Sequence, residues 1–310
     1  SFVAKIFQPQ NHINIKKGIS ANELVKEMND SGVMGAGAIA KAANIFEKMI
    51  KEKDCKIFLG MAGAMVPGGM KNIIIDIINN KLIGVFVTTG ANLTHDLVEG
   101  LGHRHYQGES NVNDSELNKK GIYRMYDCYM KNNVYEDLED FFDKHFEVLS
   151  KCKNIRELLS RLGELGPEGT ILKACYKNKI PIFCPSLADS GIGLMIWGRI
   201  AQGKETSVNA FDDLKEIIEI AWTSKKNGVF YLGGGVPKNY IQQALQVSPN
   251  KASYGIQITM DRAEPGGSSG APLKEGISWG KMKEEATFID VICDVTIALP
   301  LIYGAVKDRI

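Results

Sequence analysis

Two hydrophobic patterns alternate along the chain. Short runs of apolar and β-branched residues recur without strict polar alternation, as is typical of strands covered on both faces. Between them, apolar residues return every three or four positions, which predicts amphipathic helices. The expected strands are KIFLGMAG, LIGVFVTTGA, IPIFCPSL, GVFYLGGG, YGIQITMD and FIDVICDVT, and the expected helices include residues 21–32, 37–53, 70–80, 134–151 and 211–226.

This alternation predicts the fold class. Strands that alternate with helices indicate an α/β protein with a doubly wound, mostly parallel sheet. No linker, repeat or low-complexity block interrupts residues 1–310, so we expect a single large domain. Residues 102–134 are polar and mixed, and we interpret them as an excursion from the sheet. The buried faces of two helices are expected to carry Leu138, Phe141, Phe142, His145 and Phe146, and Leu214, Ile217, Ile218 and Trp222.

Composition and charge exclude several classes of function. The net charge of +1 provides no basic surface for nucleic acid or for an anionic membrane. No apolar stretch is long enough to span a bilayer, and the opening residues SFVAKIFQPQ lack the pattern of a secretory signal. The six cysteines form no Cys-x-x-Cys pair, which favours reduced thiols over a zinc ribbon or a dithiol. We therefore expect a cytoplasmic protein.

The ends of the expected strands are rich in glycine and small polar residues. FLGMAGAMVPGGM, VTTGAN, SLADSGIG and LGGGVPKN each follow an apolar run and precede a helical one. Small residues let a ligand approach the backbone, and the start of a helix offers free N–H groups to a phosphate. Asp189 and Asp294 follow apolar runs and are candidates to bind ribose hydroxyls. A single loop of this kind is common, because turns from a strand to a helix often need glycine, but four of them favour a nucleotide site.

Three histidines lie close together in the sequence. His95 follows the VTTGAN loop, and His103 and His105 come a few residues later. Their spacing, with Asp96 and Glu99 nearby, matches no ligand pattern for a metal. We predict no metal site and interpret His95 as a polar residue of the binding site.

One short element near the end of the chain points to covalent chemistry. In GISWGK, Gly280 separates Trp279 from Lys281. A lysine is nucleophilic only when it is uncharged, and an apolar wall such as an indole ring lowers its pKa. Together with FLG, VTTGA, LGGGVPK and ICDVTIALPLIYG, in this order and spacing, GISWGK resembles the deoxyhypusine synthase family over residues 35–307.

The resemblance implies a fold and a reaction. Members of that family have a Rossmann-like single domain, form homotetramers and share NAD and amine sites across subunit interfaces. NAD takes hydride from spermidine, 1,3-diaminopropane leaves, and the aminobutyl group forms an imine on an enzyme lysine. The group then passes to a lysine of the hypusine-carrying translation factor. The resemblance therefore implies NAD as cofactor, and spermidine and this factor as partners.

The resemblance implies roles for individual residues of the site. Lys281 matches the catalytic lysine, Trp279 the tryptophan of the amine pocket and Glu275 an amine-binding glutamate, while His95 and Asn239 occupy further substrate-binding positions. The positions that match the NAD site are Gly63, Ala64, Thr88, Thr89, Gly90, Asp189, Gly234, Gly235 and Asp294.

Other positions depart from the family pattern. Leu194 replaces an amine-binding aspartate, Asn239 a histidine and Ser268 a second acidic residue, while His95 stands where the family has an acid. A desolvated ammonium that lacks its carboxylate is costly. Three interpretations therefore remain open: protein modification with substitute acids such as Glu264, Asp261 or Asp96, synthesis of homospermidine or another polyamine, and a non-catalytic nucleotide- or polyamine-binding scaffold.

Overall fold

A parallel sheet of six strands organises the computed structural model, which describes residues 7–310. The opening residues, in which we expect no secretory signal, lie partly outside this range. All neighbouring strands of the sheet run parallel, which confirms the expected α/β fold. In spatial order the strands are β6 (Ile182–Phe183), β2 (Val85–Thr88), β1 (Cys55–Met61), β7 (Lys226–Leu232), β8 (Ala252–Thr259) and β9 (Met282–Ile292).

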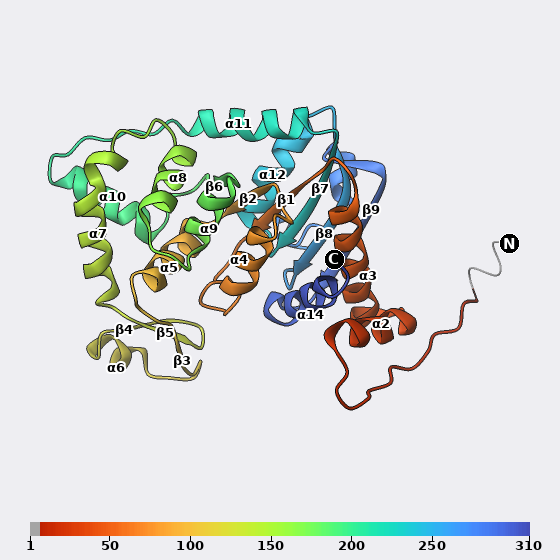
Figure 1. The fold of residues 1–310 in the computed structure, drawn as a ribbon. Coiled ribbons are helices and arrows are strands. Elements are labelled where there is room, and N and C mark those ends of the chain that lie inside the picture. The colour runs from red at the N-terminus through yellow and green to blue at the C-terminus, as the bar shows by residue number, and fades with distance from the viewer. Residues whose placement is uncertain (1–6) are drawn as a thin grey trace.

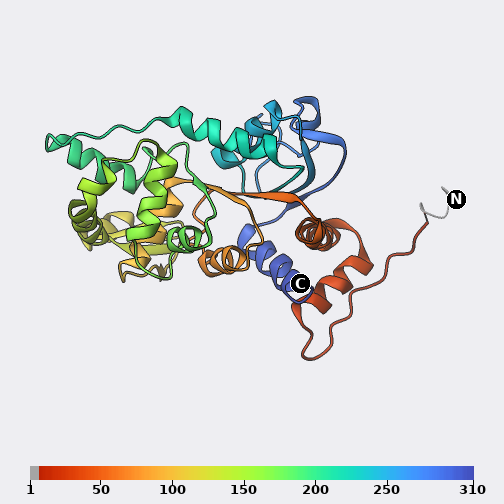
Figure 2. The same ribbon diagram turned by 45° about the horizontal axis from the view of Figure 1, so that its top comes forward.

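Helices cover both faces of this sheet, as Figures 1 and 2 show. Alternate residues of β1 point to opposite faces: Ile57 and Leu59 belong to the larger apolar core, and Phe58 to a smaller one. The larger core includes residues of α3 (Met34–Lys51), α4 (Lys71–Asn79), α5 (Gly90–Gly100) and α14 (Val295–Lys307), and the smaller core those of α11 (Ala210–Thr223) and α12 (Gly235–Val247). Burial on both faces explains why the strands are continuously apolar.

The order of the strands creates a switch point in the middle of the sheet. From β1 the chain adds β2 and β6 on one side, and then returns to add β7, β8 and β9 on the other. The helix after β1, α4, covers the larger core, whereas the helix after β7, α12, covers the smaller one. Loops that diverge in this way form the ligand-binding position of doubly wound sheets.

Most of the expected helices are present, with one error in their buried faces. On α7 (Val134–Leu149) the expected apolar residues are buried except for His145, which is half-buried. On α11, by contrast, Ile217 is buried but Trp222 is 52% exposed, because this helix lies at the periphery. The remaining helices are α2 (Ala21–Ser31), α8 (Ile155–Leu165), α9 (Ile171–Asn178), α10 (Gly191–Ala201) and the short α13 (Glu275–Ser278).

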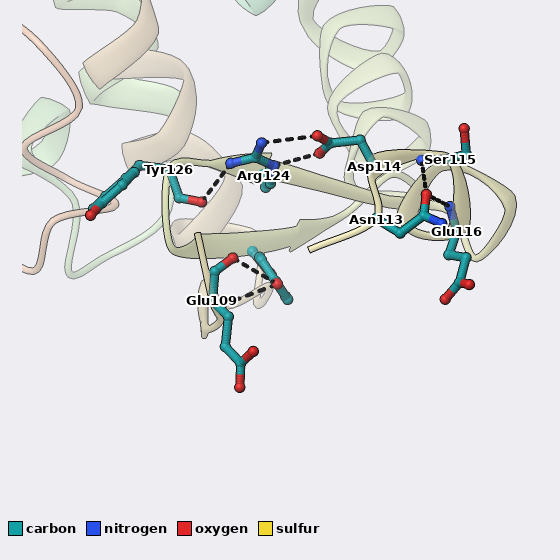
Figure 3. Close-up of polar contacts among 8 residues, drawn as sticks. Glu109, Asn113, Asp114, Ser115, Glu116, Arg124 and Tyr126 are labelled. Atoms are coloured by element: carbon teal, nitrogen blue, oxygen red, sulfur yellow. Dashed lines mark hydrogen bonds and ion pairs between the residues drawn. The ribbon is translucent and has the colours of Figure 1, made fainter. Parts of the chain in front are cut away.

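The polar stretch between α5 and α7 forms a separate small sheet, which confirms the expected excursion. Its antiparallel strands are β3 (Tyr106–Gln107), β5 (Cys128–Lys131) and β4 (Ile122–Met125), with α6 (Asp114–Lys119) beside them. Figure 3 shows the fork of Arg124 against the carboxylate of Asp114, with Arg124 Nη1 also 3.0 Å from the carbonyl oxygen of Tyr126. These contacts lie at the surface.

Three further observations concern the cysteines, the membrane-spanning segments and the metal ligands considered from the sequence. All six cysteines are free thiols. Within residues 7–310, no helix is both long and apolar enough to cross a membrane. The same residues contain no group of three or more His, Cys, Asp or Glu side chains arranged to hold a metal ion.

Candidate functional site

The glycine-rich loops meet at the carboxyl edge of the large sheet. A Cβ atom on Gly90, after β2, would lie 2.5 Å from Ser190, after β6. A Cβ atom on Gly233, after β7, would lie 3.4 Å from the Cβ atom of Ala62, after β1. Segments far apart in the sequence are therefore side by side at this edge.

Two glycines flank the switch point in backbone conformations that other residues rarely adopt. Gly63 after β1 has φ +68°, and Gly235 after β7 has φ +58°. Both angles are left-handed, which explains glycine at these positions. No atom lies within 4 Å of the place where a Cβ atom of Gly235 would stand, so the backbone is open there. Ala64 continues the loop of Gly63.

The first turn of α12 is also suited to an anion. Its N-cap residue, Gly234, has no side chain to bind the free amides of the helix. The amide of Gly235 donates to Ser269 Oγ at 3.1 Å. The position combines an open backbone with the positive end of a helix dipole, which is what a dinucleotide phosphate requires.

The polar candidates at the same edge already make contacts within the chain. Thr88 Oγ1 donates to the carbonyl of Met61 at 2.8 Å, and Thr89 Oγ1 caps α5 by accepting from the amide of Asn92. Asp294 caps α14 through Oδ1, which accepts from the amide and the hydroxyl of Thr296 at 2.6 and 2.7 Å. Its second oxygen has no hydrogen bond within the described residues and suits a ribose hydroxyl. Asp189 is exposed.

These features fit a dinucleotide. The glycine backbone at the switch point leaves room for a pyrophosphate, helix N-termini face the same edge, and carboxylates lie at its margins. The residues expected from the sequence for the cofactor are therefore brought to one edge, although their binding role stays a prediction.

Lys281 lies on the short connection between α13 and β9. Its amide donates to the carbonyl of Gly276 at 2.8 Å, and its carbonyl accepts from the amide of Ala252 at 3.2 Å. Gly280 has φ +66°, a left-handed turn that favours glycine between the tryptophan and the lysine. The backbone of Lys281 is thus held at the amino end of β9, opposite to the edge where the glycine loops meet.

The amine of Lys281 has the expected contact with the indole ring. Its Nζ lies 4.7 Å from the centroid of the Trp279 ring. Burial lowers the pKa of Lys281, and the nearby Glu275 opposes this change. Trp279 itself is 56% exposed, so in a single chain the indole forms only part of a wall. The expected apolar enclosure of the amine is therefore incomplete within one chain.

A second lysine, which the sequence analysis passed over, is among the most buried polar residues. Lys238 on α12 is only 1% exposed. Its Nζ donates to the carbonyl oxygens of Ser268 and Ala271, each at 2.6 Å. Burial lowers the pKa of Lys238 to about 8. The signal in the sequence was its position three residues after Gly235, but most lysines in such a turn are exposed.

Two of the three histidines contact each other, and the third contacts an aspartate. His95 Nδ1 is 2.9 Å from His105 Nε2, and His105 Nδ1 is 2.8 Å from Glu99 Oε1. His103 instead contacts Asp137. Burial, together with the neighbouring His105, lowers the pKa of His95 to about 4. His95 and His105 are therefore in contact, whereas His103 lies apart from them, and the role of His95 in binding stays a prediction.

The positions that depart from the family pattern lie apart from one another. Leu194 is 55% exposed on α10, beside an apolar cavity of about 510 Å³ that Trp197 also lines. Asn239 is half-buried on α12, and Ser268 has a buried hydroxyl without a hydrogen-bond partner among the described residues. Helix α10 follows the edge strand β6, and Lys281 precedes the other edge strand, β9. Leu194 and Lys281 therefore lie at opposite margins of the sheet (Figure 1).

The proposed substitution by other acids is wrong for Asp96. Its carboxylate is fully buried and accepts from the amides of Ile171 and Leu172 at 2.8 and 3.0 Å, so it caps α9. Glu264 pairs with Arg262 on an exposed loop, where Asp261 also lies. A helix cap cannot serve as an anchor for a substrate amine, which leaves Glu275, the carboxylate whose charge acts on Lys281.

Comparisons with known proteins agree with the arrangement of these elements. The family model of deoxyhypusine synthase matches residues 23–306. The chain belongs to the deoxyhypusine synthase family. It is 43% identical to a Methanosarcina acetivorans protein described as "Probable deoxyhypusine synthase 1", over 97% of this chain and 95% of that protein. A second protein of that organism, described as "Probable deoxyhypusine synthase 2", is 36% identical over 94% of this chain and 88% of its own length.

A solved structure shows the same fold. It is a candidate deoxyhypusine synthase from Entamoeba histolytica, with a TM-score of 0.67, 21% identity and 96% of both chains covered. At this identity the likeness concerns the arrangement of helices and strands. Members of the deoxyhypusine synthase family are transferases, and this chain has the fold of the family throughout.

Proposed function

We propose that this protein is an NAD-dependent aminobutyl transferase that acts on spermidine through an imine on Lys281. The observation that carries the proposal is the setting of Lys281, whose Nζ lies 4.7 Å from the Trp279 ring centroid. Burial lowers the pKa of this amine, so that the uncharged nucleophile is more populated at neutral pH than for an exposed lysine.

The cofactor is expected at the switch point. Gly63, Ala64, Gly234 and Gly235 would face its phosphates, and the second oxygen of Asp294 would accept from a ribose hydroxyl. Further contacts would come from Thr88, Thr89, Gly90 and Asp189. When bound, NAD supplies an acceptor for hydride and returns that hydride later.

Lys281 carries the transfer itself. Its neutral amine attacks the imine carbon of oxidised spermidine, the bond from that carbon to the 1,3-diaminopropane nitrogen breaks, and the amine leaves with a proton. A C=N bond to Lys281 Nζ remains. The acceptor amine then attacks the same carbon, and Lys281 departs as a free amine. Glu275, whose charge already affects Lys281, is placed to hold one ammonium end of the substrate.

The acceptor we favour is a lysine of the hypusine-carrying translation factor, because proteins described as deoxyhypusine synthases align with almost the whole chain. A small amine acceptor, as in homospermidine synthesis, is the second candidate. Leu194 and Ser268 supply no charge where the family has acids, which favours an amine with fewer or differently spaced charges. A non-catalytic scaffold is the third.

We also propose a homotetramer. Leu194 and Trp197 on α10 are exposed, at 55% and 65%, and Trp279 is 56% exposed beside Lys281. Another subunit packed on these surfaces would complete the wall around the amine, which a single chain leaves open. It would also bring the cofactor edge of one chain to the Lys281 of another, because within a single chain the two lie at opposite edges of the sheet.

The first experiment traps the intermediate on Lys281. The protein is incubated with NAD and spermidine, reduced with borohydride and mapped by peptide mass spectrometry. We expect an aminobutyl adduct on Lys281, with none in Lys281→Arg, which keeps the charge. An adduct on another lysine, or full turnover by Lys281→Ala, would contradict the assignment. Adding the translation factor in one sample and putrescine in another distinguishes the acceptors, and no adduct in any sample favours the scaffold.

The second experiment tests the cofactor site by calorimetry. Asp294→Ala removes both the cap of α14 and the candidate ribose contact, whereas Asp294→Asn keeps a capping side chain. We expect NAD affinity to fall in both variants, by roughly ten-fold for the loss of a charge-assisted hydrogen bond. Unchanged affinity in Asp294→Asn and in Asp189→Ala would remove these residues from the site.

The third experiment restores an acid to the amine pocket. Leu194→Asp is expected to strengthen spermidine binding, measured as KM for the release of 1,3-diaminopropane, because a carboxylate returns to an anchoring position. The matched control is Leu194→Asn, which has the same shape without the charge. If neither variant changes KM, Leu194 lies outside the amine site.

A further inference from the structure

Residues 262–281, called here the anchored loop, lead from the carboxyl end of β8 to the start of β9. They carry Glu275, Trp279 and Lys281. Within the loop, a Cβ atom on Gly270 would lie 1.9 Å from the carbonyl oxygen of Arg262, so the chain folds closely back on itself. The loop has almost no regular structure, and its conformation depends on what holds it.

Buried polar groups hold the anchored loop in the middle. Lys238 Nζ donates to the carbonyls of Ser268 and Ala271. Gln257 Nε2 donates to Ala271 at 3.0 Å and to Asp290 Oδ1 at 3.0 Å. The same carboxylate of Asp290 accepts from the amide of Leu273. Four backbone or side-chain contacts thus fix a short stretch of the loop against α12, β8 and β9.

The same stretch touches the glycine loop after β7. Ser269 Oγ accepts from the amide of Gly235, and a Cβ atom on Gly234 would lie 2.3 Å from Ser269 Cα. Lys238 stands one turn further along α12. Helix α12 begins at the candidate phosphate site, and its Lys238 therefore also holds the loop that ends in Lys281.

We propose that Lys238 is a positioning residue whose buried amine fixes the anchored loop to the glycine loop after β7, and so holds Lys281 in its partly buried setting. The proposal rests on the role of Lys281 proposed above. Lys238 does not touch the reacting atoms; it acts through the backbone of residues 268–271.

The charges around Lys238 act on its role as a hydrogen-bond donor. Asp290 on β9 and Glu275 on α13 favour its ammonium form, and Lys281 disfavours it. At Lys281 itself, burial lowers the pKa, and this burial depends on how the anchored loop is held.

The first test titrates Lys281 without cofactor or amine. The full-length protein is labelled with acetic anhydride between pH 7 and 11, and the modification of Lys281 is followed by peptide mass spectrometry. In Lys238→Met the midpoint of labelling is expected to move up toward that of an exposed lysine, because a loosened loop buries Lys281 less. Lys238→Arg keeps donors to the two carbonyls and should keep the midpoint. An unchanged midpoint in Lys238→Met would overturn the role of Lys238 in the setting of Lys281.

The second test measures hydrogen exchange of the anchored loop in the same variants. Losing two bonds from an ammonium to buried carbonyls should speed exchange in residues 262–281 by roughly ten-fold or more. The matched control is Lys173→Met, which removes a lysine that donates to the carbonyl of Glu164 at 2.7 Å, far from the loop. Equal exchange in Lys238→Met and in the unmodified protein would overturn the positioning role.

Two further variants keep the result interpretable. If Lys238→Met does not fold, Lys238→Gln replaces it with smaller expected changes in the same direction, because a neutral amide can keep one of the two hydrogen bonds. Gln257→Leu removes one bond to Ala271 and should speed exchange less than Lys238→Met, because Lys238 still holds Ser268 and Ala271; an equal change in the two variants would contradict a particular role of Lys238. Because neither readout needs substrate, failure of imine trapping and failure of the Lys238 role are distinguished.

Discussion

Two segments leave the main sheet of this protein, and they are held in opposite ways. The anchored loop, residues 262–281, has little regular structure but is fixed by the buried side chains of Lys238 and Gln257 and by the half-buried Asp290. The small sheet of β3, β4 and β5 is regular, yet its side-chain contacts, such as Arg124 with Asp114, lie at the surface (Figure 3).

The difference shows where positional accuracy originates. A surface ion pair is screened by water and contributes little, whereas a buried donor without its acceptor is costly. A loop pinned by buried polar groups therefore has one conformation, even without strands or helices. This is the property required of a segment that must present Lys281 beside Trp279 and Glu275.

The largest expected effect comes from removing an anchor of the loop. Asp290→Ala leaves the amide of Leu273 without its acceptor and removes one of the two acceptors of the buried Gln257, which should lower the free energy of unfolding by about 2 kcal/mol. Urea denaturation measures this change. Asp290→Asn keeps an acceptor oxygen and should lose much less. Equal losses in both variants would show that the charge matters rather than the hydrogen bonds.

An intermediate effect is expected where the small sheet joins the main body. His105, which precedes β3, contacts His95 on α5. The pKa of His95 is lowered from 6.5 to about 4, so the folded state binds fewer protons than the unfolded chain in this window. Stability that is fully present above pH 6.5 is therefore lost as the pH falls toward 4.

The contribution of His95 to stability is measured by comparing the free energy of unfolding at pH 7 and at pH 5. Between these values His95 should account for a loss of about 1 kcal/mol, allowing for its partial exposure. His95→Gln, which has no titrating group, should show a correspondingly smaller loss. If the variant and the parent lose the same stability on acidification, His95 is not the group responsible.

The smallest effect is expected inside the small sheet. Arg124→Ala removes the fork on Asp114 and should leave the free energy of unfolding almost unchanged, because this ion pair lies at the surface. The matched comparison is Arg199→Ala, which removes a guanidinium that is 1% exposed and bonded to Glu139 at 2.6 Å. Thermal unfolding measures the stability that each variant loses. Equal losses in Arg124→Ala and Arg199→Ala would contradict the comparison.

Much of the site was predictable because local rules apply to it. The left-handed glycines Gly63, Gly235 and Gly280 lie in the motifs that the sequence analysis selected. The pairing of Lys281 with Trp279 follows from two residues that are adjacent across one glycine. Such features depend on a few consecutive residues, and the sequence contains them directly.

Other features were wrong or absent in the sequence analysis because they depend on distant segments. Asp96 looked like a free acid, but it caps α9, about 75 residues further along the chain. Trp222 fits an apolar stripe, yet it is 52% exposed, because none of residues 7–310 covers it at the periphery of the molecule. Neither result could be read from the residues around these positions.

The sequence by itself determined the alternation of strands and helices, the parallel sheet, the glycine loops and the family to which the chain belongs. Only the tertiary structure decided that the β1 and β7 loops flank one switch point, and that Lys238 is buried against the carbonyls of Ser268 and Ala271. The reason is physical. Periodicity and turn chemistry act over a few residues, whereas burial of a charge depends on which acceptors the fold brings to it.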